Sequence, residues 1–332
     1  MKRCLYCYQP LEEEQIDFHP QCSKKIFGTT TPPVLPYTKA DIESLALEVV
    51  HSQVAITGVQ PKLSVDLSKE KEGEKRFTIV GLWGGYILKP QTEQYLDLPE
   101  NEDLTMHLAE LAKIKTVPHS LIRFKDGSLA YITKRIDRDK KGGKIPMEDM
   151  CQLTEKLTEQ KYKGSHEQIA KKIVEYSSYP VLDLINYFEV VLFCYLTGNA
   201  DMHLKNFSLY KGTGETTFGG AEQSQYTLSP AYDLLSTKLV IPEDNEELAL
   251  TLNGKKRKFR KSDFDNLMKT FKVDEKVIEN VYEKFRKVLP QWYYFIDVSF
   301  LPESMKEEYK QLIQSRSTIL KCLNGSSLLP VY

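Results

Sequence analysis

The chain has 332 residues, of which 41% are hydrophobic and 27% are charged, and its formal net charge at pH 7 is -1. This length is enough for a sizeable core in one large or two ordinary domains, and the balanced charge gives no general attraction for nucleic acid or an anionic membrane. No apolar run approaches the about 18 residues that indicate a membrane-spanning helix, and the first residues lack the apolar segment of a secretory signal.

The cysteines point to a small metal-binding unit at the N-terminus. We expect a cytoplasmic protein with no membrane or direct nucleic-acid contact, in which the six cysteines are thiols or metal ligands rather than disulfides. The spacing C-x2-C-x11-H-x2-C is formed by Cys4, Cys7, His19 and Cys22. Three thiolates and one imidazole suit tetrahedral Zn2+, which would stabilise a unit too small to fold alone. The alternative is two reduced cysteine pairs packed on the neighbouring domain.

The first half of the chain after this unit is rich in strand patterns. Residues 28–36 contain three prolines and are typical of a stiff linker. Residues 38–50 carry the apolar spacing of a helix, whereas residues 54–90 alternate apolar and polar positions as short strands do. A helix with one apolar face is predicted at about 101–113, and a further strand at 129–132.

The second half of the chain is predicted to be mainly helical. Residues 181–197 are apolar on nearly all sides, which indicates a buried central helix, and amphipathic helices follow at about 274–288 and 302–321. This order predicts an α+β fold with two lobes, and a ligand would be expected between them. We divide the chain into a metal unit, a β-rich lobe and a helical lobe, with the bounds 1–27, 28–134 and 135–332.

The segment from Asp201 to Asn206 carries the strongest chemical signal. An Asp followed five residues later by an Asn has the spacing D-x-x-x-x-N of the kinase catalytic loop. Asp201 would orient a substrate hydroxyl and accept its proton, and the amide oxygen of Asn206 would be a hard, neutral ligand for Mg2+. Asp233 follows where kinases place their second magnesium-binding carboxylate.

Two charged residues upstream extend the pattern. Lys89 ends an expected strand, as a lysine that pairs with the α- and β-phosphates of ATP does, and Glu102 in the next helix could hold it in place. Each residue alone has a simpler explanation, because D-x-x-x-x-N arises by chance, an isolated lysine is usually exposed, and Asp233 could cap a helix. The order of all these elements along one chain is much harder to obtain by chance.

These residues resemble a known family. The segment Gly198–Ser208 is similar to the pattern G-x-x-D-x-H-x-K-N-F-S of the HipA-like kinases. Three further blocks agree with the family in order along the chain: Gly58–Lys62, Pro146–Gln152 and Leu228–Asp233. The resemblance covers about residues 50 to 320, and it is specific because four separate blocks match.

The resemblance implies a protein-kinase-like fold and ATP- and magnesium-dependent phosphorylation of serine or threonine on a protein. Members of the family are toxins of toxin–antitoxin systems that phosphorylate aminoacyl-tRNA synthetases, and a DNA-binding antitoxin is their usual partner. It also implies that Asp201 is the catalytic base, that His203 lies near the transferred phosphate, and that Asn206 and Asp233 bind Mg2+. The ATP-binding residues that it implies are Gly58, Gln60 and Lys62 of the glycine loop, Lys89 with Glu102, and Lys134, Arg135 and Ile136 of the hinge that receives adenine.

The chain departs from the long form of the family in two places. Only about fifty residues precede the glycine loop, so the chain resembles the short HipT form, whose missing N-terminal subdomain is a separate small protein. Short members carry S-I-S-G in the loop and autophosphorylate both serines, whereas this chain has Ala55, Ile56 and Thr57. Ala55 could be natural or engineered. Thr57 is the candidate autophosphorylation site, and the alternative is an unmodified strand threonine.

Two other functions remain open. A small-molecule kinase of the aminoglycoside or choline kinase type would share Asp201, Asn206 and Asp233. It would not be expected to carry the blocks Gly58–Lys62 and Met147–Gln152. A catalytically silent binding module is the second alternative, and the intact set of catalytic residues argues against it.

Overall fold

The computed structural model describes residues 2–42, 44, 62–69, 75–80, 84–139, 142–212 and 225–322. The chain divides into two compact units, each built from several stretches. Unit 1 comprises Met1–Leu104, Val117–Lys144 and Val298–Leu301, and unit 2 comprises Thr105–Thr116, Ile145–Asp297 and Pro302–Tyr332. Helix α3 (Leu98–Leu111) begins in unit 1 and ends in unit 2, close to the helix predicted at 101–113.

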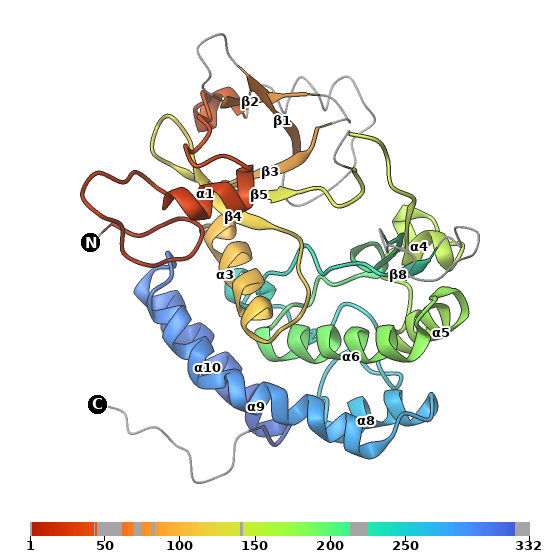
Figure 1. Cartoon of the computed structure of the whole chain (residues 1–332). Helices are drawn as coiled ribbons and strands as arrows, with labels where there is room; N and C mark the ends of the chain where they lie inside the picture. The colour runs from red at the N-terminus through yellow and green to blue at the C-terminus, as the bar shows by residue number, and fades with distance from the viewer. Residues whose placement is uncertain are drawn as a thin grey trace. The chain divides into compact units, whose positions relative to one another are not determined.

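The core of unit 1 contains a five-stranded antiparallel sheet with the order β2-β1-β3-β5-β4 (Figure 1). Its strands are β1 Leu63–Lys69, β2 Lys75–Ile79, β3 Tyr86–Pro90, β4 His119–Arg123 and β5 Leu129–Lys134. The alternating patterns predicted all of these strands except β4. That strand was missed because its first residues, His119 and Ser120, are polar although both are buried. The pairing sets Lys89 of β3 opposite Tyr131 of β5.

The N-terminal residues pack into the same core. Helix α1 (Pro20–Phe27) has a proline in its first turn, where no helical N–H bond is lost, and it ends at Gly28, whose φ of 73° is left-handed. Phe27 contacts Phe77 of β2 and Tyr86 of β3, with ring centroids 5.6 and 6.4 Å apart. The metal unit therefore shares its hydrophobic core with the sheet.

Unit 2 is mainly helical, and its most extensively buried helix is α6 (Pro180–Thr197). The other helices are α4 Met150–Leu153, α5 His166–Tyr176, α7 Thr237–Val240, α8 Lys261–Thr270, α9 Glu275–Asp297 and α10 Glu303–Ile319, with short 3-10 turns at Thr158–Gln160 and Leu204–Asn206. Contrary to our expectation, α6 is long and apolar enough to cross a membrane by length and composition. However, 67% of it is buried inside the protein, as in the core helix of a globular protein.

A second, three-stranded sheet of unit 2 was not expected. Its strands β6 (Met147–Asp149), β7 (Ser208–Lys211) and β8 (Tyr226–Leu228) pair antiparallel in that order. Strands of three or four residues are too short to show an alternating pattern, which is why the sequence predicted a mainly helical region here and no sheet. This sheet brings the segments before and after the predicted catalytic loop together.

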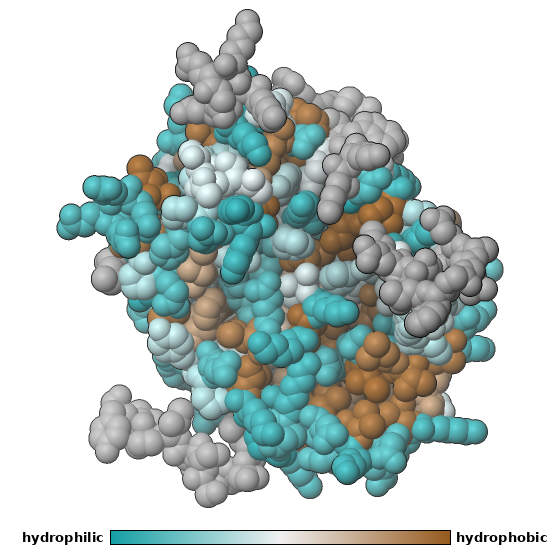
Figure 2. Space-filling view, in the orientation of Figure 1, coloured by the Kyte–Doolittle hydropathy of each residue, from teal (hydrophilic) through white to brown (hydrophobic). Residues whose placement is uncertain are grey.

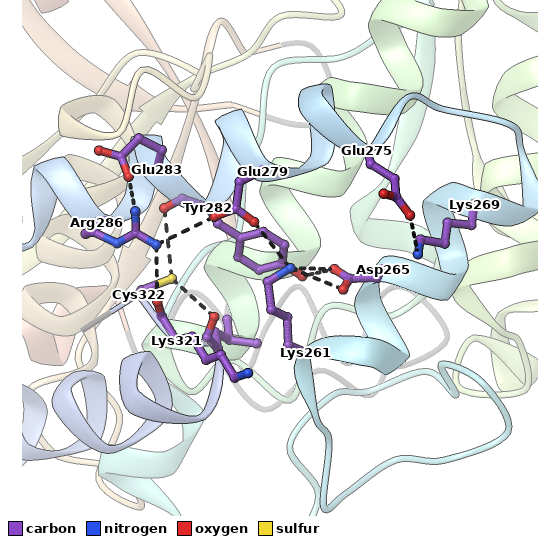
Figure 3. Close-up of polar contacts among 11 residues, drawn as sticks. Lys261, Asp265, Lys269, Glu275, Glu279, Tyr282, Glu283, Arg286, Lys321 and Cys322 are labelled. Atoms are coloured by element: carbon purple, nitrogen blue, oxygen red, sulfur yellow. Dashed lines mark hydrogen bonds and ion pairs between the residues drawn. The ribbon is translucent and has the colours of Figure 1, made fainter. Parts of the chain in front are cut away.

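Charged side chains link α8 to α9 (Figure 3). The Nζ atom of Lys261 lies 3.1 Å from a carboxylate oxygen of Asp265 and 4.0 Å from the centre of the Tyr282 ring. Tyr282 in turn donates a hydrogen bond of 2.9 Å to Asp265, and Lys269 pairs with Glu275 at 2.7 Å. The Lys269–Glu275 pair is exposed and screened by solvent, so the buried apolar face of α9 supplies most of this packing.

Large apolar side chains are exposed around α5 and the start of α6. They are Val174, Tyr176, Tyr179, Val181 and Leu182, and Val181 is the most exposed at 65%. Figure 2 shows apolar surface gathered over this region, within a face that is otherwise largely hydrophilic. A patch of this kind is typical of surfaces that another protein covers.

Candidate active site

The predicted catalytic loop begins where α6 ends. Gly198 closes the helix with a left-handed φ of 74°, and a Cβ atom at this position would lie only 2.6 Å from the Leu312 side chain. The side chain of Asn199 then accepts a hydrogen bond of 3.0 Å from the backbone N–H of Asp201. The next contact is a 2.9 Å bond from the N–H of Ala200 to the Thr237 hydroxyl. The loop conformation is therefore set by glycine and by these side-chain bonds.

Within the loop, Asn206 is bound to the residue that starts the motif. Its Nδ2 group donates a hydrogen bond of 3.0 Å to the backbone carbonyl of Asp201, which spans the five-residue spacing. Because the amide nitrogen faces this carbonyl, the amide oxygen points elsewhere and can accept a further partner. Lys205, in the 3-10 turn between them, pairs with Asp149 at 2.6 Å and ties the loop to β6.

The second acidic loop, which ends at Asp233, is attached to the first. Ser229 donates a backbone bond of 2.9 Å to Ser208, and the Tyr232 hydroxyl lies 2.7 Å from the Ser208 hydroxyl and donates to the Lys205 carbonyl at 3.0 Å. Asp233 has a φ of 62°, in the left-handed region that non-glycine residues adopt uncommonly. The structure thus brings Asp201, Asn206 and Asp233 into one region of unit 2.

Tyr162 is a further residue of this region that the sequence analysis missed. Its hydroxyl donates a hydrogen bond to Oδ1 of Asp201, and its ring packs edge-on against His203 with centroids 5.0 Å apart. Burial, this hydrogen bond and the charges of Asp201 and Asp233 raise the pKa of Tyr162. No motif contains Tyr162, so nothing in the sequence pointed to it.

His203 lies among the same groups. Burial lowers the pKa of His203, against the charges of Asp201 and Asp233, so the imidazole is neutral near pH 7. The side chain is 6% exposed, and its Nδ1 atom has no hydrogen-bond partner among the residues that the structure describes. The charges of Asp201 and Asp233 therefore affect the pKa values of both Tyr162 and His203. The Nδ1 atom of His203 can hydrogen-bond to a ligand.

In unit 1, the two charged residues that the sequence analysis placed before the catalytic loop, Lys89 and Glu102, lie together. Lys89 of β3 and Glu102 of α3 form an ion pair of 2.5 Å, and their side chains are 5% and 1% exposed. The Lys89 ammonium also lies 5.2 Å from the centre of the Tyr131 ring, an arrangement that favours the charged amine. The predicted Lys89–Glu102 pairing is confirmed.

The remaining predicted ATP-binding residues fall into two groups. Gly58, Gln60 and Thr57 lie outside the described residues, and Lys62 just before β1 is exposed. The segment Lys134–Ile136 begins at the last residue of β5, and the backbone N–H of Arg135 donates to the carbonyl of Gly85 at 2.9 Å. An adenine ring at this segment would therefore have to use backbone groups other than that N–H.

The four predicted zinc ligands of unit 1 are also brought together. The thiol and imidazole atoms of Cys4, Cys7, His19 and Cys22 all lie within 4.8 Å of one another. A hydrogen bond from the Cys7 thiol, stronger than the opposing effect of burial, lowers the pKa of Cys4 to about 4. The other three cysteines, Cys151, Cys194 and Cys322, are buried and free.

Comparisons with known proteins agree on one family. A model of the HipA-like C-terminal domain matches residues 54–292. A protein of Haemophilus influenzae named "Putative kinase" is 26% identical, over 89% of this chain and 90% of its own length. The Sinorhizobium fredii protein "Putative kinase Y4dM" is 30% identical over 70% of this chain and 58% of its own length, so the chain spans little more than half of that relative.

Two solved structures share the fold. HipA in the Shewanella oneidensis toxin–antitoxin complex with HipB and operator DNA superposes with a TM-score of 0.61 and 19% identity, covering 82% of this chain and 70% of that one. The Helicobacter pylori proinflammatory kinase CtkA gives 0.52 and 14%, covering 71% and 88%. At these identities the likeness establishes the fold alone, and it confirms the predicted α+β protein-kinase-like fold with a β-rich and a mainly helical part.

Proposed function

Since the chain belongs to the family of the HipA-like C-terminal domain, we propose that it is an ATP- and Mg2+-dependent Ser/Thr protein kinase and the toxin of a toxin–antitoxin pair. The observation that carries the proposal is the arrangement of the two acidic loops of unit 2. Asn206 is bound to the backbone of Asp201, and the charges of Asp201 and Asp233 act on the same Tyr162 and His203 side chains.

Asp201 is the proposed base. Its Oδ1 atom accepts a hydrogen bond from the Tyr162 hydroxyl, so this carboxylate already makes the contact that a serine or threonine hydroxyl would make. In kinases the carboxylate holds the hydroxyl in line with the γ-phosphorus and takes its proton as the new P–O bond forms and the bond from the γ-phosphorus to the bridging oxygen of the leaving ADP breaks. A substrate hydroxyl must therefore displace Tyr162 or use the other carboxylate oxygen.

Asn206 and Asp233 are the proposed Mg2+ ligands. Their amide and carboxylate oxygens are the hard donors that Mg2+ prefers, and the Asn206 amide nitrogen is engaged, which leaves its oxygen for the metal. When bound, Mg2+ would neutralise phosphate charge and orient the transferred group. His203, neutral and with Nδ1 available, would contact the same phosphate.

Lys89 is proposed to bind the α- and β-phosphates, with Glu102 as the residue that holds it. The ion pair is buried within unit 1, so the ammonium is held in a fixed position. A pre-organised charge saves the entropy of ordering a flexible lysine. Gly58, Gln60 and Lys62 would cover the phosphates, and the segment Lys134–Ile136 would receive adenine.

The finer assignments follow the family resemblance. The proposed protein substrate is a translation component such as an aminoacyl-tRNA synthetase, and Thr57 is the proposed site of autophosphorylation. The Shewanella oneidensis HipA was solved with HipB and operator DNA. By analogy we propose a DNA-binding antitoxin as partner. A cytoplasmic location fits these partners.

Phosphoproteomics in the host tests this proposal. Induction of the wild-type chain should add phosphate to serine or threonine of a small set of proteins, and induction of Asp201→Asn should add none. Phosphorylation of a small molecule with an unchanged phosphoproteome would favour the small-molecule kinase alternative. No ATP-dependent phosphorylation by the purified wild-type protein would favour the silent binding module.

A further inference from the structure

The N-terminal Cys/His cluster has the geometry of a metal site. The Sγ atoms of Cys7 and Cys22 lie 3.4 and 3.8 Å from Nδ1 of His19. Zinc bonds of about 2.3 Å to sulfur and about 2.0–2.1 Å to nitrogen in a tetrahedron place these atoms about 3.6 Å apart. The observed separations lie on either side of this value, and all four ligand atoms lie within 4.8 Å of one another, as one tetrahedral ion requires.

The protonation of His19 also suits a metal. Its Nε2 atom lies 3.0 Å from the carbonyl oxygen of Pro10, which can only accept a hydrogen bond. Nε2 therefore carries the proton, and the lone pair of Nδ1 points at the thiols of Cys7 and Cys22. A carbonyl that fixes the tautomer in this way is typical of histidines that bind metals.

The four ligands come from two local structures that hold them at close range. Cys4 and Cys7 lie in a tight turn, closed by a bond of 2.9 Å from the N–H of Tyr8 to the carbonyl of Cys4. His19 is the N-cap residue of α1, and Cys22 lies in its first turn. Short-spaced pairs in a turn and at a helix start allow both ends of the unit to reach one ion.

The turn places the side chain of Tyr8 in contact with helix α3. Tyr8 follows Cys7 directly, has a left-handed φ of 62°, and is fully buried. Its hydroxyl donates a hydrogen bond of 2.7 Å to Asp103 of α3, whose other carboxylate oxygen lies 2.7 Å from Nδ1 of His119. A bulky residue keeps a left-handed backbone only when its surroundings enforce it, and here a closed metal site would do so.

Asp103 is the neighbour of the residue that holds the phosphate lysine. Glu102 precedes it on α3 and pairs with Lys89 at 2.5 Å. A contact that fixes Asp103 therefore fixes the same helical turn that carries Glu102. The chain of contacts runs from the metal cluster through Tyr8 and Asp103 to the Lys89–Glu102 pair, entirely within unit 1.

We propose that Cys4, Cys7, His19 and Cys22 bind one Zn2+ ion, and that this ion positions helix α3, and with it the Lys89–Glu102 pair, through Tyr8. The metal part stands on the cluster alone, and the part concerning Lys89 rests on the proposed kinase function. Zn2+ here is a structural ion with four protein ligands and no open position for chemistry.

The metal part is tested on the full-length wild-type protein purified without chelator. Elemental analysis should give about one Zn2+ per chain, and replacement by Co2+ should produce the thiolate charge-transfer and visible absorption of a tetrahedral site. Cys4→Ser should lose the metal, whereas Cys151→Ser, which changes a buried thiol of unit 2, should keep it. This part would be overturned if the wild-type protein retained no Zn2+ after the ion is added. That outcome does not depend on whether any variant folds.

The coupling part is tested with a matched pair of hydroxyl deletions. Tyr8→Phe removes the bond to Asp103, and Tyr86→Phe removes a buried bond of 3.1 Å to the carbonyl of Ile26 in the same unit. Both variants should retain Zn2+, but only Tyr8→Phe should speed amide exchange in the first turns of α3 and weaken ATP binding, by roughly fivefold or more. Equal exchange in α3 for both variants would overturn the coupling.

These readouts separate the proposal from the kinase assignment. Zinc content and amide exchange do not depend on ATP, so Zn2+ with faster exchange in Tyr8→Phe supports the inference even if the wild-type protein fails to bind ATP. That failure would count against the proposed function alone. Conversely, a fully active kinase without Zn2+ would overturn the inference and leave the function intact.

Discussion

Unit 1 and unit 2 differ in how their functional carboxylates are neutralised. In unit 1, Glu102 and Asp103 are buried, and both are hydrogen-bonded within the unit at 2.5 and 2.7 Å. In unit 2, Asp201 is half-exposed and forms no ion pair among the residues that the structure describes; its carboxylate accepts the hydroxyl of Tyr162. Glu102 and Asp103 thus hydrogen-bond to buried side chains of their own unit, whereas Asp201 is partly open to solvent.

This difference separates two kinds of role. A buried carboxylate with a partner fixes geometry, because moving it would strand a charge away from water. A half-exposed carboxylate without a cation can take a substrate hydroxyl or act beside a bound metal at little cost. We therefore expect substitutions in unit 1 to change stability and ATP affinity, and substitutions in the loops of unit 2 to change turnover.

The largest effect is expected for Asp201→Asn. This change keeps the shape of the side chain and removes its basicity, so kcat should fall by about two to four orders of magnitude while ATP still binds. Stopped-time phosphorylation assays with parallel ATP titration measure both quantities. Glu243→Gln, an exposed carboxylate of a unit 2 loop, is the control and should match the wild type. Equal kcat in Asp201→Asn and the control would remove Asp201 from the chemistry.

The next effect concerns the buried ion pair. Lys89→Met removes the ammonium from a buried ion pair and should lower the free energy of unfolding by about 3–5 kcal/mol, measured by urea denaturation. Adding Glu102→Gln, which neutralises the carboxylate as well, should recover most of this stability, but it should not recover ATP affinity. Lys125→Met, at an exposed turn, is the control for loss of a lysine. Recovery of ATP affinity in the double variant would contradict a direct role of Lys89.

A smaller effect is expected for Asp233→Asn. Loss of one anionic ligand should raise the Mg2+ concentration needed for half-maximal activity by about tenfold or more, since even outer-shell changes cost that much in metal sites. Activity is measured against Mg2+ at saturating ATP. An unchanged Mg2+ requirement would exclude Asp233 as a ligand.

Tyr162→Phe removes the hydroxyl that donates a hydrogen bond to the Asp201 carboxylate. If substrate displaces this hydroxyl, its removal should lower KM for the protein substrate by about threefold to tenfold, the equivalent of a partly exposed hydrogen bond, with little change in kcat. Steady-state kinetics separate the two constants. Tyr179→Phe, which removes an exposed hydroxyl bonded to Gln225, should change neither. A higher KM in Tyr162→Phe would instead make the hydroxyl part of the substrate site.

A separate effect, on stability rather than on activity, is a pH dependence from His166. Burial lowers the pKa of His166 from 6.5 to about 3, and its Nδ1 atom lies 2.6 Å from the Tyr187 hydroxyl. The unfolded chain therefore binds a proton that the folded chain does not, so stability is full above pH 6.5 and is lost as the pH falls toward 3. At pH 5 the loss should reach about 2 kcal/mol. Urea midpoints at pH 7.5 and 5 should differ less in His166→Gln, and an equal difference would contradict this assignment.

The sequence predicted the parts of the molecule that depend on short-range patterns. The patterns at 63–67 and 86–89 predicted strands, the apolar run at 181–197 predicted α6, and the D-x-x-x-x-N spacing predicted the loop in which the structure shows Asn206 bonded to Asp201. Each pattern predicts structure because the residues involved are neighbours in the chain.

Long-range contacts and overridden local preferences could not be predicted. Tyr162 reaches Asp201 across 39 residues, and Tyr8 reaches Asp103 across 95, and no pattern records either pairing. Helix α9 was expected to end at about residue 288, but it continues to Asp297 through Pro290. A proline costs a helix one backbone bond, and here the burial of Trp292 and Ile296 beyond it outweighs that cost.

The most direct test of the account is transfer of labelled γ-phosphate by the purified protein. With ATP and Mg2+, the wild-type chain should place label on serine or threonine of a protein, and Asp201→Asn should bind ATP equally well and place none. Label on protein from the Asp201→Asn variant at the wild-type rate, or ATP turnover by the wild type with no labelled protein hydroxyl, would contradict the account.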